Sequence, residues 1–129
     1  MARRFSIMAS ILRVNTLTDA SSNNSIATSV LFNGSAKAWN NVTQGTSAIQ
    51  DSYNISSISD DSTGTYTQNY TSNMSNTGFS VSGTCQNAGH IGTTGTFGSS
   101  STQLITVITT NANANDYDDA CNSVHGDLA

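Results

Sequence analysis

The chain has 129 residues, a formal net charge of −4 and 9 % charged residues, and glutamate and proline are absent from it. Three of its four basic residues fall within the first thirteen positions, which excludes the basic surface that nucleic-acid binding requires. No apolar run is long enough for a membrane-spanning helix. Few residues favour helices, so we expect β-structure whose faces are covered by Ser, Thr and Asn.

Residues 1–20 are predicted to form an extended N-terminal arm or first strand, and residues 21–129 a β-sandwich domain. Apolar residues occupy both faces of the segment 11–17, which indicates burial on both sides or docking between subunits. Arg13 interrupts the short apolar stretch that follows the basic start, and this argues against a signal peptide. Met1 and Met8 both remain possible start residues. The residues predicted to contact other subunits or the particle are Ile11, Leu12, Val14 and Leu17.

Two further strands are predicted before residue 45. Residues 19–24 have the composition of a loop, and residues 26–32 are predicted to form a strand that the turn dipeptide Asn33-Gly34 ends. Residues 37–42 follow as a strand with the only tryptophan, Trp39. We expect this side chain to anchor the core or the contact between two sheets.

A β-hairpin is predicted over residues 52–71. Residues 52–58 alternate apolar and polar side chains, and residues 65–71 are rich in Thr and Tyr, which suit a pleated surface. Between them, residues 60–64 form a turn in which Gly64 can adopt a positive φ. Asp60 and Asp61 are interpreted as turn residues that bond the local backbone, not as paired catalytic carboxylates.

The remaining segments complete an all-β pattern. In residues 79–85, apolar residues and glycine alternate strictly with Ser and Thr. The Gly-containing segment 86–101 is predicted as a long surface loop, with a brief strand around Ile91 or Phe97 as the alternative. Residues 103–109 are predicted as a central strand covered on both faces. Residues 111–119 form a loop and residues 120–125 the closing strand. About seven or eight short strands predict an antiparallel β-sandwich of jelly-roll-like architecture, without a helix of normal length.

Several short fragments carry a resemblance. They are A-K-A-W at 36–39, D-S-Y-N-I-S-S-I at 51–58, G-D-L-A at the C-terminus, and the start M-A-S-I-L-R-V-N-T-L at 8–17. In these fragments the chain resembles tail-fibre-type virion structural proteins of marine and cyanobacterial phages. It departs from their pattern at Gln50, at Asn40-Asn41 and at His125. The resemblance implies a phage structural protein and leaves its place in the particle open.

Neither a metal site nor a cofactor site is predicted. Residues 113–119 contain several oxygen ligands that Ca²⁺ could use, from Asn113, Asn115, Asp116, Asp118 and Asp119. They match no EF-hand spacing and include no bidentate Glu, so a solvated loop is the preferred interpretation. The two histidines, His90 and His125, lie on different segments without a nucleophile motif, and no catalytic residue is assigned.

Cys85 and Cys121 both fall on predicted strands. They could form a disulfide if those strands are neighbours. A phage protein assembles in a reducing cytoplasm, however, so buried free thiols are the preferred interpretation.

Three functions follow from these observations. The first is a non-enzymatic virion subunit, a small tail-fibre or appendage protein that forms a homotrimer, assembles in the host cytoplasm and resides in the virion. The alternatives are a capsid decoration (cement) protein on the phage head and a carbohydrate-binding module with exposed aromatics drawn from Trp39, Tyr53, Tyr70 and Tyr117. The expected partners are copies of the chain and other tail or capsid proteins. A host surface glycan is a further candidate partner, which would bind the loops 86–101 and 111–119. Neither nucleic-acid binding nor membrane insertion is expected. An enzyme is not expected.

Overall fold

The computed structural model describes residues 13–22, 24–86, 89–108 and 113–129. The chain divides into two compact units, one that ends at Phe32 and one that comprises Asn33–Ala129. We call them the N-terminal unit and the β-domain. This division lies between Phe32 and Asn33, whereas the sequence prediction placed the end of the N-terminal arm at residue 20.

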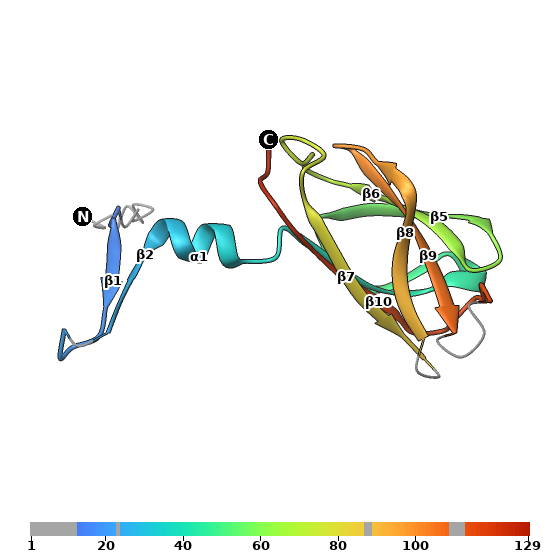
Figure 1. The fold of residues 1–129 in the computed structure, drawn as a ribbon, viewed down its shortest axis with the longest axis horizontal. Helices are drawn as coiled ribbons and strands as arrows, with labels where there is room; N and C mark the ends of the chain where they lie inside the picture. The colour runs from blue at the N-terminus through green and yellow to red at the C-terminus, as the bar shows by residue number, and fades with distance from the viewer. Residues whose placement is uncertain (1–12, 23, 87–88, 109–112) are drawn as a thin grey trace, which may run out of the picture. The chain divides into compact units, whose positions relative to one another are not determined.

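The N-terminal unit contains a short hairpin and most of a short helix (Figure 1). Strand β1 (Thr16–Thr18) pairs antiparallel with β2 (Ser25–Ala27), and Leu17 lies opposite Ile26. Helix α1 (Thr28–Gly34) follows directly, and its last two residues belong to the β-domain. The predicted loop at 19–24 therefore connects β1 and β2.

The prediction of a single strand over residues 26–32 is wrong, because the strand ends at Ala27 and α1 begins. Residues 29–32 do not alternate polar and apolar side chains, so one face of a strand could not gather their apolar groups. The hydroxyl of Thr28 also donates a hydrogen bond to the carbonyl of Val14 at 3.1 Å, which fixes the start of the helix. Asn33 and Gly34 end the helix and do not form a hairpin turn.

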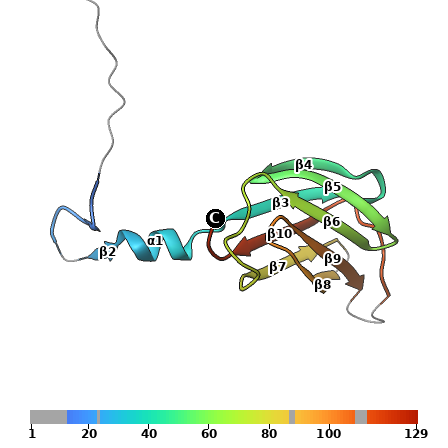
Figure 2. The same cartoon turned by 90° about the horizontal axis from the view of Figure 1, so that it is seen from above.

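The β-domain is a single antiparallel sheet of eight strands in the part of the chain that the structure describes, in the order β4-β3-β10-β7-β8-β9-β6-β5. The sheet curls over on itself (Figures 1 and 2), so that β3 and β10 pack against β5 and β6. The predicted all-β antiparallel sandwich is confirmed. The strands are β3 (Ala38–Thr43), β4 (Ala48–Tyr53), β5 (Ile55–Ser62), β6 (Thr65–Tyr70), β7 (Ser80–Cys85), β8 (Gly89–Phe97), β9 (Ser101–Ile108) and β10 (Ala120–His125), with a 3₁₀ turn η1 (Gln44–Thr46) after β3.

The predicted hairpin is formed by β5 and β6, and Gly64 adopts the expected positive φ of 70°. The predicted strand 52–58 is, however, broken at Asn54, which has a φ of 58° and separates β4 from β5. Asn tolerates this left-handed conformation better than most residues. Its side chain donates to the carbonyls of Lys37 and Ser72 at 3.0 Å and accepts from the backbone N–H of Ser72 at 2.7 Å. The break therefore ties three segments together.

The prediction of a surface loop over residues 86–101 is wrong. Most of this segment is β8, which pairs with β7 and along much of its length with β9. Its frequent glycines weaken the alternating pattern, but backbone pairing between two neighbouring strands does not require apolar side chains. β9 is an interior strand as predicted, while the coverage of its two faces depends on side chains at 103–109 that lie outside the described residues.

Trp39 does not anchor the core, contrary to the prediction. It is 38 % exposed, whereas its neighbours Ala38 and Asn40 are buried. Because successive side chains of a strand point to opposite faces, the burial of Ala38, Asn40 and Val42 directs Trp39 outward. The apolar core instead contains tyrosine, phenylalanine, aliphatic and sulfur-containing side chains, in two clusters of which one includes Tyr66 and the other Phe79.

A buried chain of side-chain hydrogen bonds crosses the sandwich between the two layers. The Asn122 amide donates to Asn40 at 2.6 Å, and the Asn40 amide donates to Gln68 at 2.9 Å. Gln68 donates to the Tyr70 hydroxyl at 3.2 Å, which lies 2.8 Å from the hydroxyl of Thr102. The chain thus links β10, β3, β6 and β9, and we call it the interlayer polar network. Within the described residues, no helix is both long and apolar enough to cross a membrane.

We predict that Asn40→Ala destabilises the fold by about 2–4 kcal/mol, because the buried amides of Asn122 and Gln68 each lose the hydrogen bond that they form with Asn40. The measurement is the free energy of unfolding in urea. Asn73→Ala, at an exposed position, is the control and should change this free energy by less than about 0.5 kcal/mol. Equal effects of the two substitutions would contradict the role given to the network.

Candidate functional site

The carboxylates singled out in the sequence hold local structure. Asp60 and Asp61 lie within β5, and the turn itself is Thr63-Gly64, so their placement in the turn is wrong. Asp61 accepts a hydrogen bond from the Thr67 hydroxyl at 2.7 Å, across the β5–β6 hairpin. This bond is typical of a carboxylate that stabilises a strand pair.

The acidic loop before β10 also makes structural hydrogen bonds. Asp116 accepts the backbone N–H of Gly64 at 2.6 Å and so ties this loop to the β5–β6 turn. Asp119 accepts from the amides of Gln86 at 2.8 Å and Gln50 at 3.3 Å. Among the described residues, no group of three or more His, Cys, Asp or Glu side chains is placed to hold a metal ion.

The two histidines lie on different strands. His125 ends β10 opposite Ser80, and His90 lies in β8 opposite Thr84. The His90 side chain falls outside what the structure describes.

Cys85 and Cys121 lie on neighbouring strands, as a disulfide would require, but both are free thiols. The register explains why they do not pair. Cys121 lies opposite Thr84 and Cys85 opposite Ala120, so the two thiols are offset by one residue and point to opposite faces of the sheet. Cys85 is buried, as the free-thiol interpretation expected, whereas Cys121 is only partly buried and lies on the outer surface. Burial raises the pKa of both thiols above the usual value.

The four aromatic residues proposed for sugar stacking divide into two pairs. Tyr70 and Tyr117 are 5 % and 3 % exposed and belong to the core, so they cannot present a ring to a ligand. Trp39 and Tyr53 are 38 % and 52 % exposed. They are direct partners on β3 and β4, so two exposed aromatic residues are neighbours across this pair of strands.

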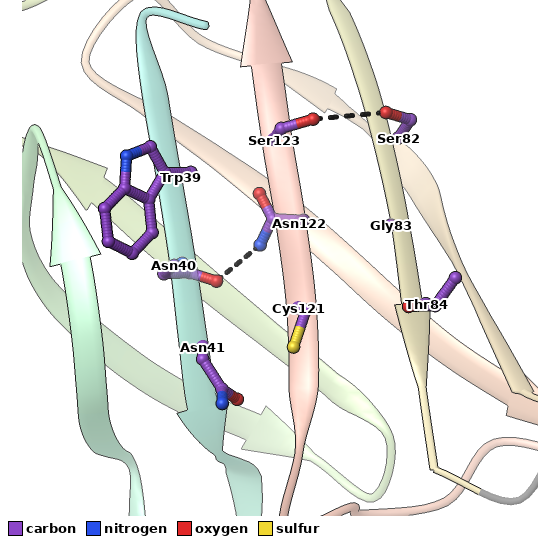
Figure 3. Close-up of a pocket in the computed structure, with 9 residues that line it drawn as sticks. All are labelled: Trp39, Asn40, Asn41, Ser82, Gly83, Thr84, Cys121, Asn122 and Ser123. Atoms are coloured by element: carbon purple, nitrogen blue, oxygen red, sulfur yellow. Dashed lines mark hydrogen bonds between the residues drawn. The ribbon is translucent and has the colours of Figure 1, made fainter.

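A shallow depression of about 560 Å³ lies beside Trp39 on the outward surface of β3, β10 and β7 (Figure 3). We call this surface, together with the adjoining β4, the outer face. Two rows of partnered residues run across it. The first row is Tyr53, Trp39, Ser123 and Ser82, and the second is Asp51, Asn41, Cys121 and Thr84.

Sequence reasoning missed this depression, because it depends on the position of β10 between β3 and β7. β10 follows β3 by some eighty residues in the chain. No local pattern in the sequence specifies that pairing. The aromatic residues Trp39 and Tyr53 were the only feature of the sequence that pointed to a binding surface here.

The N-terminal unit presents apolar side chains to solvent. α1 buries none of its residues, and Val30 and Phe32 are each 56 % exposed. Of the predicted contact residues, Val14 and Leu17 are exposed, as a contact site requires, and Ile11 and Leu12 lie outside the described residues. We define the N-terminal apolar surface as Val14, Leu17, Ile26, Val30, Leu31 and Phe32.

Comparison of the chain with protein-family models, curated proteins and solved structures finds no match.

We predict that both thiols react slowly with a chromogenic disulfide reagent in the folded protein, and that Cys85 is the slower because it is buried. Since a raised pKa lowers the thiolate fraction at a given pH, both rates should keep rising above about pH 8.5, the usual thiol pKa. Cys85→Ser and Cys121→Ser assign the two kinetic phases. The denatured protein should show two reactive thiols per chain, and a result of none would indicate a disulfide and contradict the prediction.

Proposed function

We propose that this protein is a non-enzymatic structural subunit of a bacteriophage virion, a small tail-fibre or appendage protein. In this proposal the subunits associate through the N-terminal apolar surface. The observation that carries the proposal is that the side chains of this surface are exposed and that helix α1 buries none of its residues. The assignment to a virion is supported by the resemblance of the sequence fragments to tail-fibre-type proteins, and a homotrimer is part of the same proposal.

The N-terminal unit is too small to be stable by itself. Its strands have three residues each and α1 has seven, whereas isolated hairpins and helices of this size are marginal in water. Full burial of a side chain such as Leu31 or Phe32 contributes about 1.5–3 kcal/mol. Contact between copies of the unit would bury several of these side chains in each chain and so would stabilise both the unit and the assembly.

A structural role is also consistent with how the described carboxylates are used. Asp61, Asp116 and Asp119 each accept hydrogen bonds that hold turns and strand ends. Glycoside hydrolysis commonly requires a pair of carboxylates that face one substrate groove. The depression on the outer face is lined by neutral side chains, which favours binding over hydrolysis.

We predict that the full-length protein sediments as a trimer and that the double substitution Leu31→Asp, Phe32→Asp converts it to monomers, because burying two carboxylates at the contact is unfavourable. The measurement is sedimentation velocity, with circular dichroism to establish that the β-domain stays folded. Ile49→Asp is the matched control, an exposed apolar residue on β4 of the other unit. A wild-type monomer would refute self-association through the N-terminal unit.

The place in the particle is tested separately by a cryo-EM map of the intact phage. We expect density for the β-domain along a tail fibre or appendage. Density at the threefold or quasi-threefold positions of the capsid would instead identify a decoration protein on the head, and the appendage proposal would be abandoned.

A further inference from the structure

The outer face carries two exposed aromatic rings that contribute little to the core. Trp39 and Tyr53 are cross-strand partners, and such partners have Cβ atoms about 4.5–5.5 Å apart. In Figure 3 the indole of Trp39 extends from β3 to the side away from β10. The two rings therefore form an aromatic platform at one edge of the depression, and a flat apolar ring face is a surface on which a planar partner can stack.

The rest of the depression is lined by small polar side chains. Ser123 follows Trp39 in the first row and Ser82 follows Ser123, while Thr84 closes the second row. The hydroxyls of Ser82 and Ser123 lie 3.3 Å apart, which leaves each of them capacity for further hydrogen bonds. Next to a large indole, these small side chains create a hollow of about 560 Å³, within the size range of small-molecule sites.

Two residues that line the depression, Asn41 and Asn122, each have an amide oxygen that accepts no hydrogen bond within the described part of the chain. The amide nitrogen of Asn41 makes only long contacts, 3.4 Å to Asp119 and 3.5 Å to Gln50. The Oδ1 atom of Asn41 is buried, so the amide would have to turn toward a ligand, and it would then offer both a donor and an acceptor.

The charge of the site narrows the class of ligand. All the residues that line the depression are neutral, and the nearest charge in the two rows is the carboxylate of Asp51, opposite Asn41. A phosphate or an acidic polymer would lack a cationic partner here. A continuous protein interface would need apolar groups at its centre, and the centre of this face carries Ser82, Ser123 and Thr84 instead.

We propose that the outer face binds a neutral oligosaccharide. The apolar C–H face of a pyranose ring would stack on Trp39 and Tyr53, and its hydroxyls would exchange hydrogen bonds with Asn41, Ser123 and Thr84. This inference rests on the outer face alone and does not depend on association through the N-terminal apolar surface.

The test uses the full-length protein and its single tryptophan, which lies in the proposed site. Linear hexasaccharides of glucose, galactose, mannose and N-acetylglucosamine are titrated one by one, with hexagalacturonic acid as the charged comparison. We expect at least one neutral hexasaccharide to shift the tryptophan emission to shorter wavelength with saturation, and the charged one to bind more weakly. No saturable change with any neutral hexasaccharide, or tighter binding of the charged one, would overturn the proposal.

Three variants make the test specific. Tyr53→Ala should weaken binding roughly three- to tenfold, the effect of losing one stacked ring, and Tyr53→Phe should retain it. Ile49→Ala, at an exposed apolar position on the same strand, is the control and should leave the affinity unchanged. Equal losses in Tyr53→Ala and Ile49→Ala would overturn the proposal. A change of sedimentation coefficient in Tyr53→Ala would also overturn it, because the face would then contact a second copy of the chain.

Discussion

The interlayer polar network is the constraint on which the rest of the β-domain depends. Asn40 occupies its centre, where it accepts from Asn122 on the neighbouring strand and donates to Gln68 on the opposite layer. A hydrogen bond of this kind contributes only about 1 kcal/mol, but a buried amide left without a partner costs more. The hydrogen bonds of the network therefore form in one register of β3 and β10, and a slip by one residue would place its amides in solvent and bring Trp39 inward.

The same register creates the outer face. Because side chains alternate along a strand, an inward Asn40 forces Trp39 and Asn41 outward, and an inward Asn122 forces Cys121 and Ser123 outward. The aromatic platform and the hollow beside it are thus a consequence of how the core is bonded. This coupling also explains why Cys121 and Cys85 remain separate thiols, since adjacent positions in paired strands point to opposite faces.

Local patterns in the sequence predicted the elements that are built from local contacts. The β5–β6 hairpin was found because its turn contains Gly64, and β7 because its residues alternate strictly. β8 was missed because glycines hide its period, and its pairing with β9 is a property of the backbone. Trp39 was misplaced because apolar character alone favours burial, whereas the small inward residues Ala38 and Val42 already fill that side of β3. Only Trp39 and Tyr53 pointed to the site in the sequence, because the other side of the site comes from β10, which is distant in sequence from β3.

The two units meet different physical requirements, and this difference supports a division of roles. The β-domain buries its own core, so it can present Trp39 and Tyr53 to solvent without losing its fold. The described residues of the N-terminal unit form no such core, so contact with other surfaces would add to the stability of this unit. A protein that anchors itself through one segment and presents a rigid polar face on another needs this arrangement, since the strength of the anchor can then change without altering the geometry of the face.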